Sequence, residues 1–108
     1  MTDTPTILIY ATYRIQSHDV EAFRALASRM ASAARMRDGC TFIDVAEDIN
    51  AVGTFRLIEG WRDQAALTAH LSTADFQSIR GEAGKLGIND RQADAYSISG
   101  KTPLDMPA

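Results

Sequence analysis

The stretch from Thr6 to Ile15, TILIYATYRI, constrains the fold of this chain more than any other. β-Branched and aromatic residues dominate it, which predicts a β-strand. Residues at both alternating positions are mostly apolar, whereas a strand with one solvated face alternates apolar and polar residues. We therefore expect a strand that is covered on both faces, and the rest of the molecule has to supply both covers.

The remaining patterns predict helices and strands in a definite order. Apolar residues at three-and-four spacing indicate an amphipathic helix, and Asp or Thr residues stand where helices begin. The final strand is less apolar than the others, so we expect it at an edge or an interface. The predicted segments are a helix from Val20 to Asp38-Gly39, a hairpin of strands at 40–47 and 52–61, two short helices capped by Asp63 and by Thr73 or Asp75, a break at Asn89-Asp90, and a strand at 92–99.

This β-α-β-β-α-β order predicts a ferredoxin-like α+β sandwich, with a four-stranded antiparallel sheet and helices on one face. At 108 residues we expect a single domain over 1–108, with a core at 6–100 and loose termini at 1–5 and 101–108. The uncovered sheet face needs a partner, and the simplest is the same face of a second copy. We therefore predict a homodimer.

Charge and apolar content exclude several classes of partner. The net charge is −3 and no Lys/Arg cluster occurs, which argues against nucleic acid and against an anionic membrane surface. The apolar runs are far shorter than a membrane span, and residues 1–5 lack the basic region of a signal peptide. The single cysteine, Cys40, cannot form an intrachain disulfide, which suits a reducing compartment. We expect a cytoplasmic protein.

Metal, phosphate and nucleophile motifs are absent from the sequence. There is no HExxH or CxxC, and the two histidines, His18 and His70, are far apart, so no metal is expected. The glycines at 81, 84 and 87 follow a helix rather than a strand, which does not fit a phosphate-binding loop. GxSxG is also missing. The sequence implies no cofactor.

Aromatic and polar residues stand at positions where a core residue is usually apolar, namely Tyr13, Trp61, His70 and Arg80. Each has a structural interpretation: an aromatic core residue, a histidine bonded to backbone, or an arginine whose head reaches water. Glu59 is expected to pair with an arginine or to lie at a solvated strand end. Because the four residues converge on one side of a small sheet, they favour an apolar pocket with a few polar groups.

Short motifs along the chain are similar to those of one known family. They are Asp38-Gly39-Cys40, Glu59-x-Trp61, Ala66-Leu67-x-x-His70, Phe76 and the strand Tyr10–Ile15. Together they resemble the antibiotic biosynthesis monooxygenase domain family over about residues 6–100. The resemblance implies a dimeric α+β barrel, and a function like that of the cofactor-independent quinol and polyketide monooxygenases.

The resemblance can be followed residue by residue in two branches of the family. Trp61 and Arg80 match the tryptophan and pocket arginine of anthrone monooxygenases, whereas Leu67 and Leu57 replace their pocket tyrosine and asparagine.

In the haem-degrading branch, Arg80 stands at the axial histidine position, His70 at the haem-distorting tryptophan and Tyr13 at the first-strand asparagine. A guanidinium cannot serve as the iron ligand, so haem degradation is disfavoured. His70 is common in quinol-monooxygenase-like members.

We hypothesise a cofactor-free monooxygenase that oxidises a small quinol, phenolic or polyketide-like aromatic with dioxygen. The expected catalytic residues are His70 as base or proton shuttle, Arg80 as the holder of a phenolate or peroxide anion, and Trp61 as a wall with an indole N–H donor. The expected substrate-binding residues are Tyr13, Leu57, Leu67 and Phe76. The alternatives are an isomerase that acts by proton transfer, a small-ligand binder, or a purely structural dimer.

Overall fold

The computed structural model describes residues 4–107, and all structural statements below concern these residues. The strands are β1 Ile7–Ile15, β2 Cys40–Glu47, β3 Thr54–Trp61 and β4 Ile88–Ser97, and the helices are the 3₁₀ helix η1 Ser17–Asp19, α1 Val20–Ala34, α2 Gln64–Leu71 and α3 Ala74–Ala83. The predicted order of elements and the ferredoxin-like fold class are confirmed.

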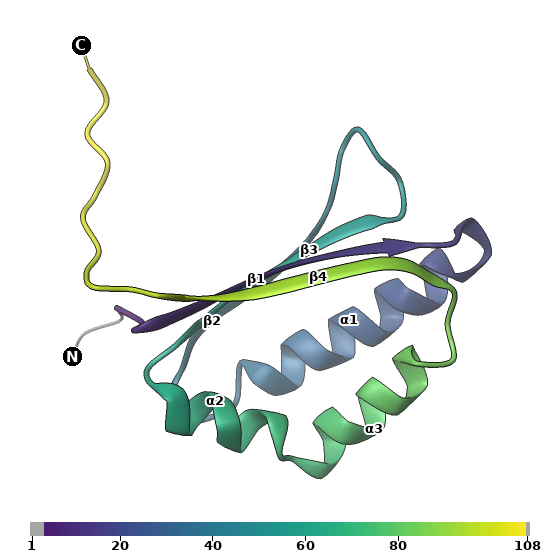
Figure 1. Ribbon diagram of the computed structural model, residues 1–108, viewed down its shortest axis with the longest axis horizontal. Helices are drawn as coiled ribbons and strands as arrows, with labels where there is room; N and C mark the ends of the chain where they lie inside the picture. The colour runs from purple at the N-terminus through teal and green to yellow at the C-terminus, as the bar shows by residue number, and fades with distance from the viewer. Residues whose placement is uncertain (1–3, 108) are drawn as a thin grey trace.

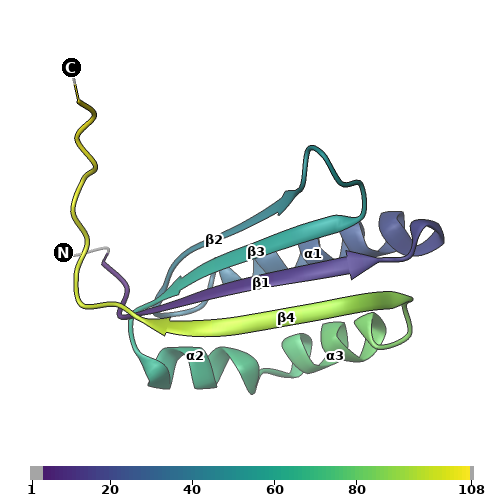
Figure 2. The same ribbon diagram turned by 45° about the horizontal axis from the view of Figure 1, so that its top comes forward.

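The four strands form one antiparallel sheet in the order β2-β3-β1-β4. All three α-helices lie on one face of it, and the other face is uncovered (Figures 1 and 2). β1 is a central strand, paired with β3 on one side and β4 on the other. The helices cover one of its two faces, and a cover for the other face stays a prediction. β4 lies at an edge, as its composition predicted.

Several predicted boundaries were wrong. β3 begins at Thr54 rather than at residue 52, because the chain is still turning at Gly53, where φ is +87°. α1 ends at Ala34, and a turn closed by Gly39 with φ +86° follows it.

The predicted break at Asn89-Asp90 is also absent. β4 already begins at Ile88 and ends at Ser97, and Asp90 pairs with Arg14 of β1 in register and through a 2.8 Å ion pair. Tertiary pairing therefore overrides the local turn preference of Asn and Asp at this point.

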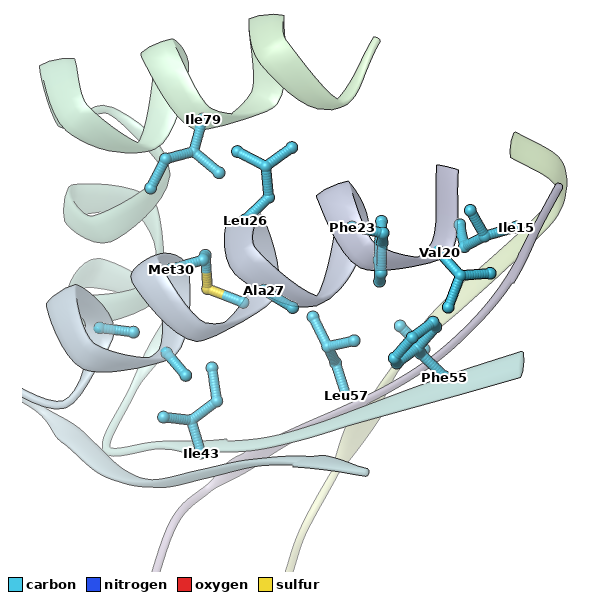
Figure 3. Packing of buried hydrophobic residues seen from close by; sticks show 13 residues of the cluster. Ile15, Val20, Phe23, Leu26, Ala27, Met30, Ile43, Phe55, Leu57 and Ile79 are labelled. Atoms are coloured by element: carbon cyan, nitrogen blue, oxygen red, sulfur yellow. The ribbon is translucent and has the colours of Figure 1, made fainter. Parts of the chain in front are cut away.

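The main core fills the space between α1 and the sheet (Figure 3). The apolar stripe of α1 supplies Phe23, Leu26 and Met30, and these side chains meet those of the sheet. Ile79 reaches the same core from α3. Each such buried aliphatic or aromatic side chain contributes roughly 1.5–3 kcal/mol.

A smaller cluster of Trp61, Ala66 and Leu67 lies under α2. α2 begins where the Asp63 carboxylate accepts a hydrogen bond from Ala66 N at 2.8 Å, so the predicted cap is present. α3 begins at Thr73, whose hydroxyl oxygen accepts from Phe76 N, so Thr73 rather than Asp75 is the cap. These two caps set where His70 and Phe76 lie.

No helix within residues 4–107 is long and apolar enough to cross a membrane. Beyond β4 the chain runs away from the sheet as an extended segment (Figure 1). Part of the expected loose termini, residues 1–3 and 108, lies outside the described residues.

Candidate functional site

A pocket of about 550 Å³ lies between α1, α3 and the helix-facing side of the sheet. Its walls are mainly aliphatic and aromatic, with arginine and glutamine as the polar exceptions. The lining residues are Phe23, Leu26, Ala27 and Met30 of α1; Phe76, Gln77, Ile79, Arg80 and Ala83 of α3; Tyr13, Leu57, Ile88 and Arg91 of the sheet; and Leu71 and Gly84. A mostly apolar pocket with a few polar groups is typical of a small-molecule site.

A smaller hollow of about 330 Å³ lies between α1 and β2. Of its charged residues, Arg24 and Glu47 already pair with each other at 2.7 Å, and Arg35 donates to the backbone carbonyl of Ile43. This hollow therefore offers a ligand no unpaired charge from that pair, and the larger pocket is the better candidate.

The structure divides the predicted site residues into two adjoining groups. Tyr13, Leu57, Phe76 and Arg80 line the pocket. Trp61, His70 and Leu67 do not line it; they lie behind Phe76 or under α2, and all three are buried. Their assignment to a catalytic or binding role remains a prediction.

An aromatic stack joins the two groups. The rings of Trp61 and His70 are stacked, with centroids 4.8 Å apart, and the His70 ring meets the edge of Phe76 at 4.9 Å. Trp61 has no exposed surface and His70 is 2% exposed. Because Phe76 also lines the pocket, its ring separates His70 from the pocket interior.

The indole N–H of Trp61 is paired inside the protein. It donates to the Glu59 carboxylate at 3.0 Å instead of pointing at an open site. The expectation that Glu59 pairs with an arginine or lies at a solvated strand end was wrong, because Glu59 is buried on β3 between Ile9 of β1 and Ile43 of β2. Burial raises the pKa of the Glu59 carboxyl, and the bond from Trp61 opposes that shift.

His70 is held in its neutral form by its surroundings. Burial lowers the pKa of the imidazole, the nearby Arg37 guanidinium lowers it further, and the Asp75 carboxylate acts in the opposite direction. Nδ1 of His70 is buried and has no hydrogen-bond partner within residues 4–107. The structural interpretation, in which the histidine is bonded to backbone, therefore does not apply to this atom. A neutral imidazole with an unpaired nitrogen is chemically able to take a proton.

Arg80 and Arg91 are the cationic residues of the pocket. Both are exposed, and neither forms an ion pair with a carboxylate of residues 4–107. The Arg91 Nε donates to the Tyr13 hydroxyl at 3.1 Å, and its guanidinium carbon is 5.6 Å from the centre of the Tyr13 ring.

Sequence reasoning missed Arg91. The predicted break at 89–90 placed it before the last strand, where no register could relate it to another residue. With β4 beginning at Ile88, Arg91 lies directly opposite Tyr13. A prediction that began the last strand at Ile88 and paired it with β1 would have placed Tyr13 and Arg91 opposite each other, on the same face of the sheet.

Within residues 4–107 no group of three or more histidine, cysteine, aspartate or glutamate residues is arranged to hold a metal ion. The candidate site therefore consists of the apolar pocket, its two arginines, the Tyr13 hydroxyl and the aromatic stack behind Phe76.

Comparison with known proteins identifies the family to which this chain belongs. The family model described as "Antibiotic biosynthesis monooxygenase" matches residues 6–82. A curated Bacillus subtilis protein named "Putative monooxygenase YcnE" is 28% identical over 80 residues, which is 74% of this chain and 84% of that protein.

Solved structures show the same fold. A putative antibiotic biosynthesis monooxygenase from Deinococcus radiodurans superposes with a TM-score of 0.84 at 25% identity, covering 94% of this chain and 99% of that one. PA3566 from Pseudomonas aeruginosa gives a TM-score of 0.81 at 23% identity, covering 93% and 100%. The family match spans well over half of the residues, and this chain therefore belongs to the antibiotic biosynthesis monooxygenase family.

Proposed function

We propose that this protein is a cofactor-independent monooxygenase that oxidises a small quinol, phenolic or polyketide-like aromatic with dioxygen. Family membership supports a monooxygenase-like function in general terms. The observation that carries the finer proposal is the apolar pocket, which combines an arginine free of carboxylate partners, Arg80, with a buried neutral histidine one ring behind its wall.

The first step is removal of a proton from the substrate. His70 is neutral at neutral pH and has an unpaired nitrogen, which suits a base. Because the Phe76 ring lies between His70 and the pocket, the proposal requires this ring to turn aside when substrate binds. Phe76 is in the first turn of α3, next to the cap at Thr73, so a local shift of that turn is sufficient.

The second step is oxidation of the resulting anion. A carbanion or phenolate can pass an electron to dioxygen, and the radical pair then combines to a peroxide at carbon. For a CH₂ carbon the balance is one O₂ consumed, one oxygen atom retained as a carbonyl and the other released as water with the two hydrogens. Arg80 stabilises the negative charge on the phenolate or the peroxide.

Trp61 has a different role in this proposal from the one expected of its N–H. Since that N–H is donated to Glu59, the indole serves as a rigid stacking wall that orients His70. Leu57 and Tyr13 contact the substrate directly from the sheet, and Leu67 supports the stack from below.

Oxygen uptake with a panel of quinols and anthrones tests the proposal. We expect His70→Ala to lower the rate about a hundredfold or more and Arg80→Ala about a hundredfold, because each loses a group that acts in the transition state. Trp61→Phe should lower it less, by misorienting His70. Arg29→Ala is the matched control, since Arg29 pairs with Glu82 outside the pocket.

If His70→Ala, Arg80→Ala and Trp61→Phe all keep the wild-type rate while folding normally by near-UV circular dichroism, the site is assigned wrongly. If no member of the panel consumes oxygen, the monooxygenase proposal itself fails.

An isomerase is the second candidate, because a neutral base and an unpaired guanidinium also serve an enolisation without oxygen. Turnover of an enolisable ketone under nitrogen would favour it. Turnover that needs dioxygen favours the monooxygenase, and saturable binding without turnover favours a binding protein.

We further propose that the protein is a cytoplasmic homodimer. The uncovered sheet face carries apolar residues, and a second copy of this face is the simplest cover. The face presents Leu8, Tyr10, Phe42, Ile58 and Tyr96, of which Tyr10 and Tyr96 are 40% and 54% exposed. The arginines of the same face, Arg14 and Arg56, are each paired with an aspartate, which is compatible with burial.

A further inference from the structure

We infer that Arg91 determines substrate specificity by selecting, together with Arg80, an aromatic substrate that carries an ionised carboxylate. The inference rests on the proposed function for its site and extends it to the substrate class. Two independent features of the pocket lead to it: the way in which Arg91 is held, and the absence, among residues 4–107, of an acidic side chain that pairs with it.

Arg91 is held in a fixed orientation by Tyr13. The two residues are register partners on β4 and β1, so both side chains leave the sheet on its helix-facing side. The guanidinium lies over the Tyr13 ring, with its carbon 5.6 Å from the ring centre, and Nε donates to the hydroxyl at 3.1 Å. Since a guanidinium has five N–H donors, the forked end remains available for a ligand.

Most other arginines of residues 4–107 are neutralised inside the protein. Ion pairs join Arg14 to Asp90, Arg24 to Glu21 and Glu47, Arg29 to Glu82, Arg37 to Asp75, Arg56 to Asp48, and Arg62 to Asp38 and Asp63. Arg35 donates to the backbone carbonyl of Ile43. Arg80 and Arg91 differ from these, because no carboxylate of the described residues pairs with either, and they lie on the same pocket.

This concentration of unpaired positive charge contrasts with the chain as a whole, whose net charge is −3. Among the described residues that line the pocket there is no aspartate or glutamate. A carboxylate fits the guanidinium fork by two parallel hydrogen bonds, and the aliphatic and aromatic walls accommodate the ring that bears it. An arginine that only shielded the Tyr13 ring would contribute stability and give no preference for a charged ligand.

Binding of two probes of nearly equal shape separates these interpretations. The probes are 1-hydroxy-2-naphthoate and its neutral amide, titrated calorimetrically under nitrogen at pH 7. We expect the wild-type protein to bind the acid at least tenfold more tightly than the amide, as a charged hydrogen-bonded pair typically gives. Arg91→Gln should abolish most of that preference while leaving the affinity for the amide unchanged.

Two further variants complete the design. Arg91→Lys keeps the charge but loses the fork, so its preference should lie between those of wild type and Arg91→Gln. Lys101→Gln makes the same change in net charge in the exposed segment after β4 and should keep the wild-type preference. If Arg91→Gln fails to fold by near-UV circular dichroism, a preference in Arg91→Lys equal to that of wild type counts against the inference.

The inference is overturned if wild type shows no preference for the acid, if Arg91→Gln keeps the preference, or if neither probe binds at millimolar concentration. Oxygen uptake with the same two compounds separates this outcome from the proposed function. If the preference depends on Arg91 but no oxygen is consumed, the inferred substrate class is supported and the monooxygenase proposal is refuted. If oxygen is consumed with equal kcat/KM for the acid and the amide, the monooxygenase proposal is supported and the inferred substrate class is refuted.

Discussion

Glu59 and His70 are buried titratable residues linked by Trp61, and burial favours the neutral form of each. Their effects on stability have opposite signs with pH. The folded-state pKa of His70 is lowered, so the unfolded chain takes up the proton first and stability falls as pH drops below the ordinary histidine value of about 6.5. The folded-state pKa of Glu59 is raised, so its contribution is lost as pH rises above the ordinary glutamate range.

The change Glu59→Gln tests this assignment at the residue scale. Gln keeps an oxygen that can accept from the Trp61 N–H but has no charge to bury. We expect it to stabilise the protein at pH 8 by about 1–3 kcal/mol, the usual cost of a buried group that is incompletely satisfied, and to have little effect near pH 4. Urea unfolding across this pH range measures the difference.

Glu82→Gln is the control for that experiment. Glu82 is partly exposed and its pKa is lowered, chiefly by its hydrogen bond with Arg29, so removing its charge should slightly destabilise the protein at pH 8. Equal responses of the two variants would contradict the assignment of Glu59 as a buried carboxyl that is bonded to Trp61 but has no cationic partner among the described residues.

At the scale of elements, the position of α2 decides where His70 and the stack lie. α2 begins at the Asp63 cap and packs Ala66 against the turn that precedes β2. That turn contains Gly39, where φ is +86° and where an added Cβ would lie 2.4 Å from the Cβ of Ala66. Gly39 therefore allows both the turn and the close approach of the helix.

We predict that Gly39→Ala destabilises the protein by about 2–3 kcal/mol. Alanine is strained in the left-handed conformation of this residue, and its Cβ would also clash with Ala66. Since α2 has to move to relieve the clash, the Trp61–His70 stacking should also change, which near-UV circular dichroism detects. Gly81→Ala is the matched control. Gly81 lies inside α3 with open space around its missing Cβ, so this change should stabilise the protein by about 0.5–1 kcal/mol. Similar losses in both variants in urea unfolding would contradict this account.

At the scale of the whole molecule, helices cover one face of the sheet and leave the other face uncovered. The pocket lies on the helix side of the sheet and the predicted dimer uses the opposite face, so a ligand and a second copy would occupy different surfaces. We propose that residues 1–108 form one domain whose core is residues 6–100.

The dimer is tested by Tyr10→Glu, which places a second negative charge directly opposite Asp94 in the middle of the open face. We expect the wild-type protein to sediment as a dimer and the variant to dissociate at least tenfold more readily, because buried like charges without a counter-charge strongly disfavour an interface. Met36→Glu is the control, since Met36 is 84% exposed in the turn after α1. A monomeric wild-type protein, or an unaffected Tyr10→Glu dimer, would refute the proposed interface.

The sequence by itself determined the order of elements, the helix cap at Asp63 and the family. These depend on periodicity and local hydrogen bonding, which residues close in the chain control. Of the four residues predicted to converge on one side of the sheet, Tyr13 and Arg80 line the pocket, whereas Trp61 and His70 lie in the buried stack.

Only the tertiary structure decided how the candidate site divides into a pocket and a buried stack. Glu59 became a buried partner of Trp61, and Arg91 a neighbour of Tyr13, through strand register between segments far apart in the chain. Register and helix docking depend on long-range contacts such as Arg14 with Asp90 and Gly39 with Ala66, and no local pattern encodes them.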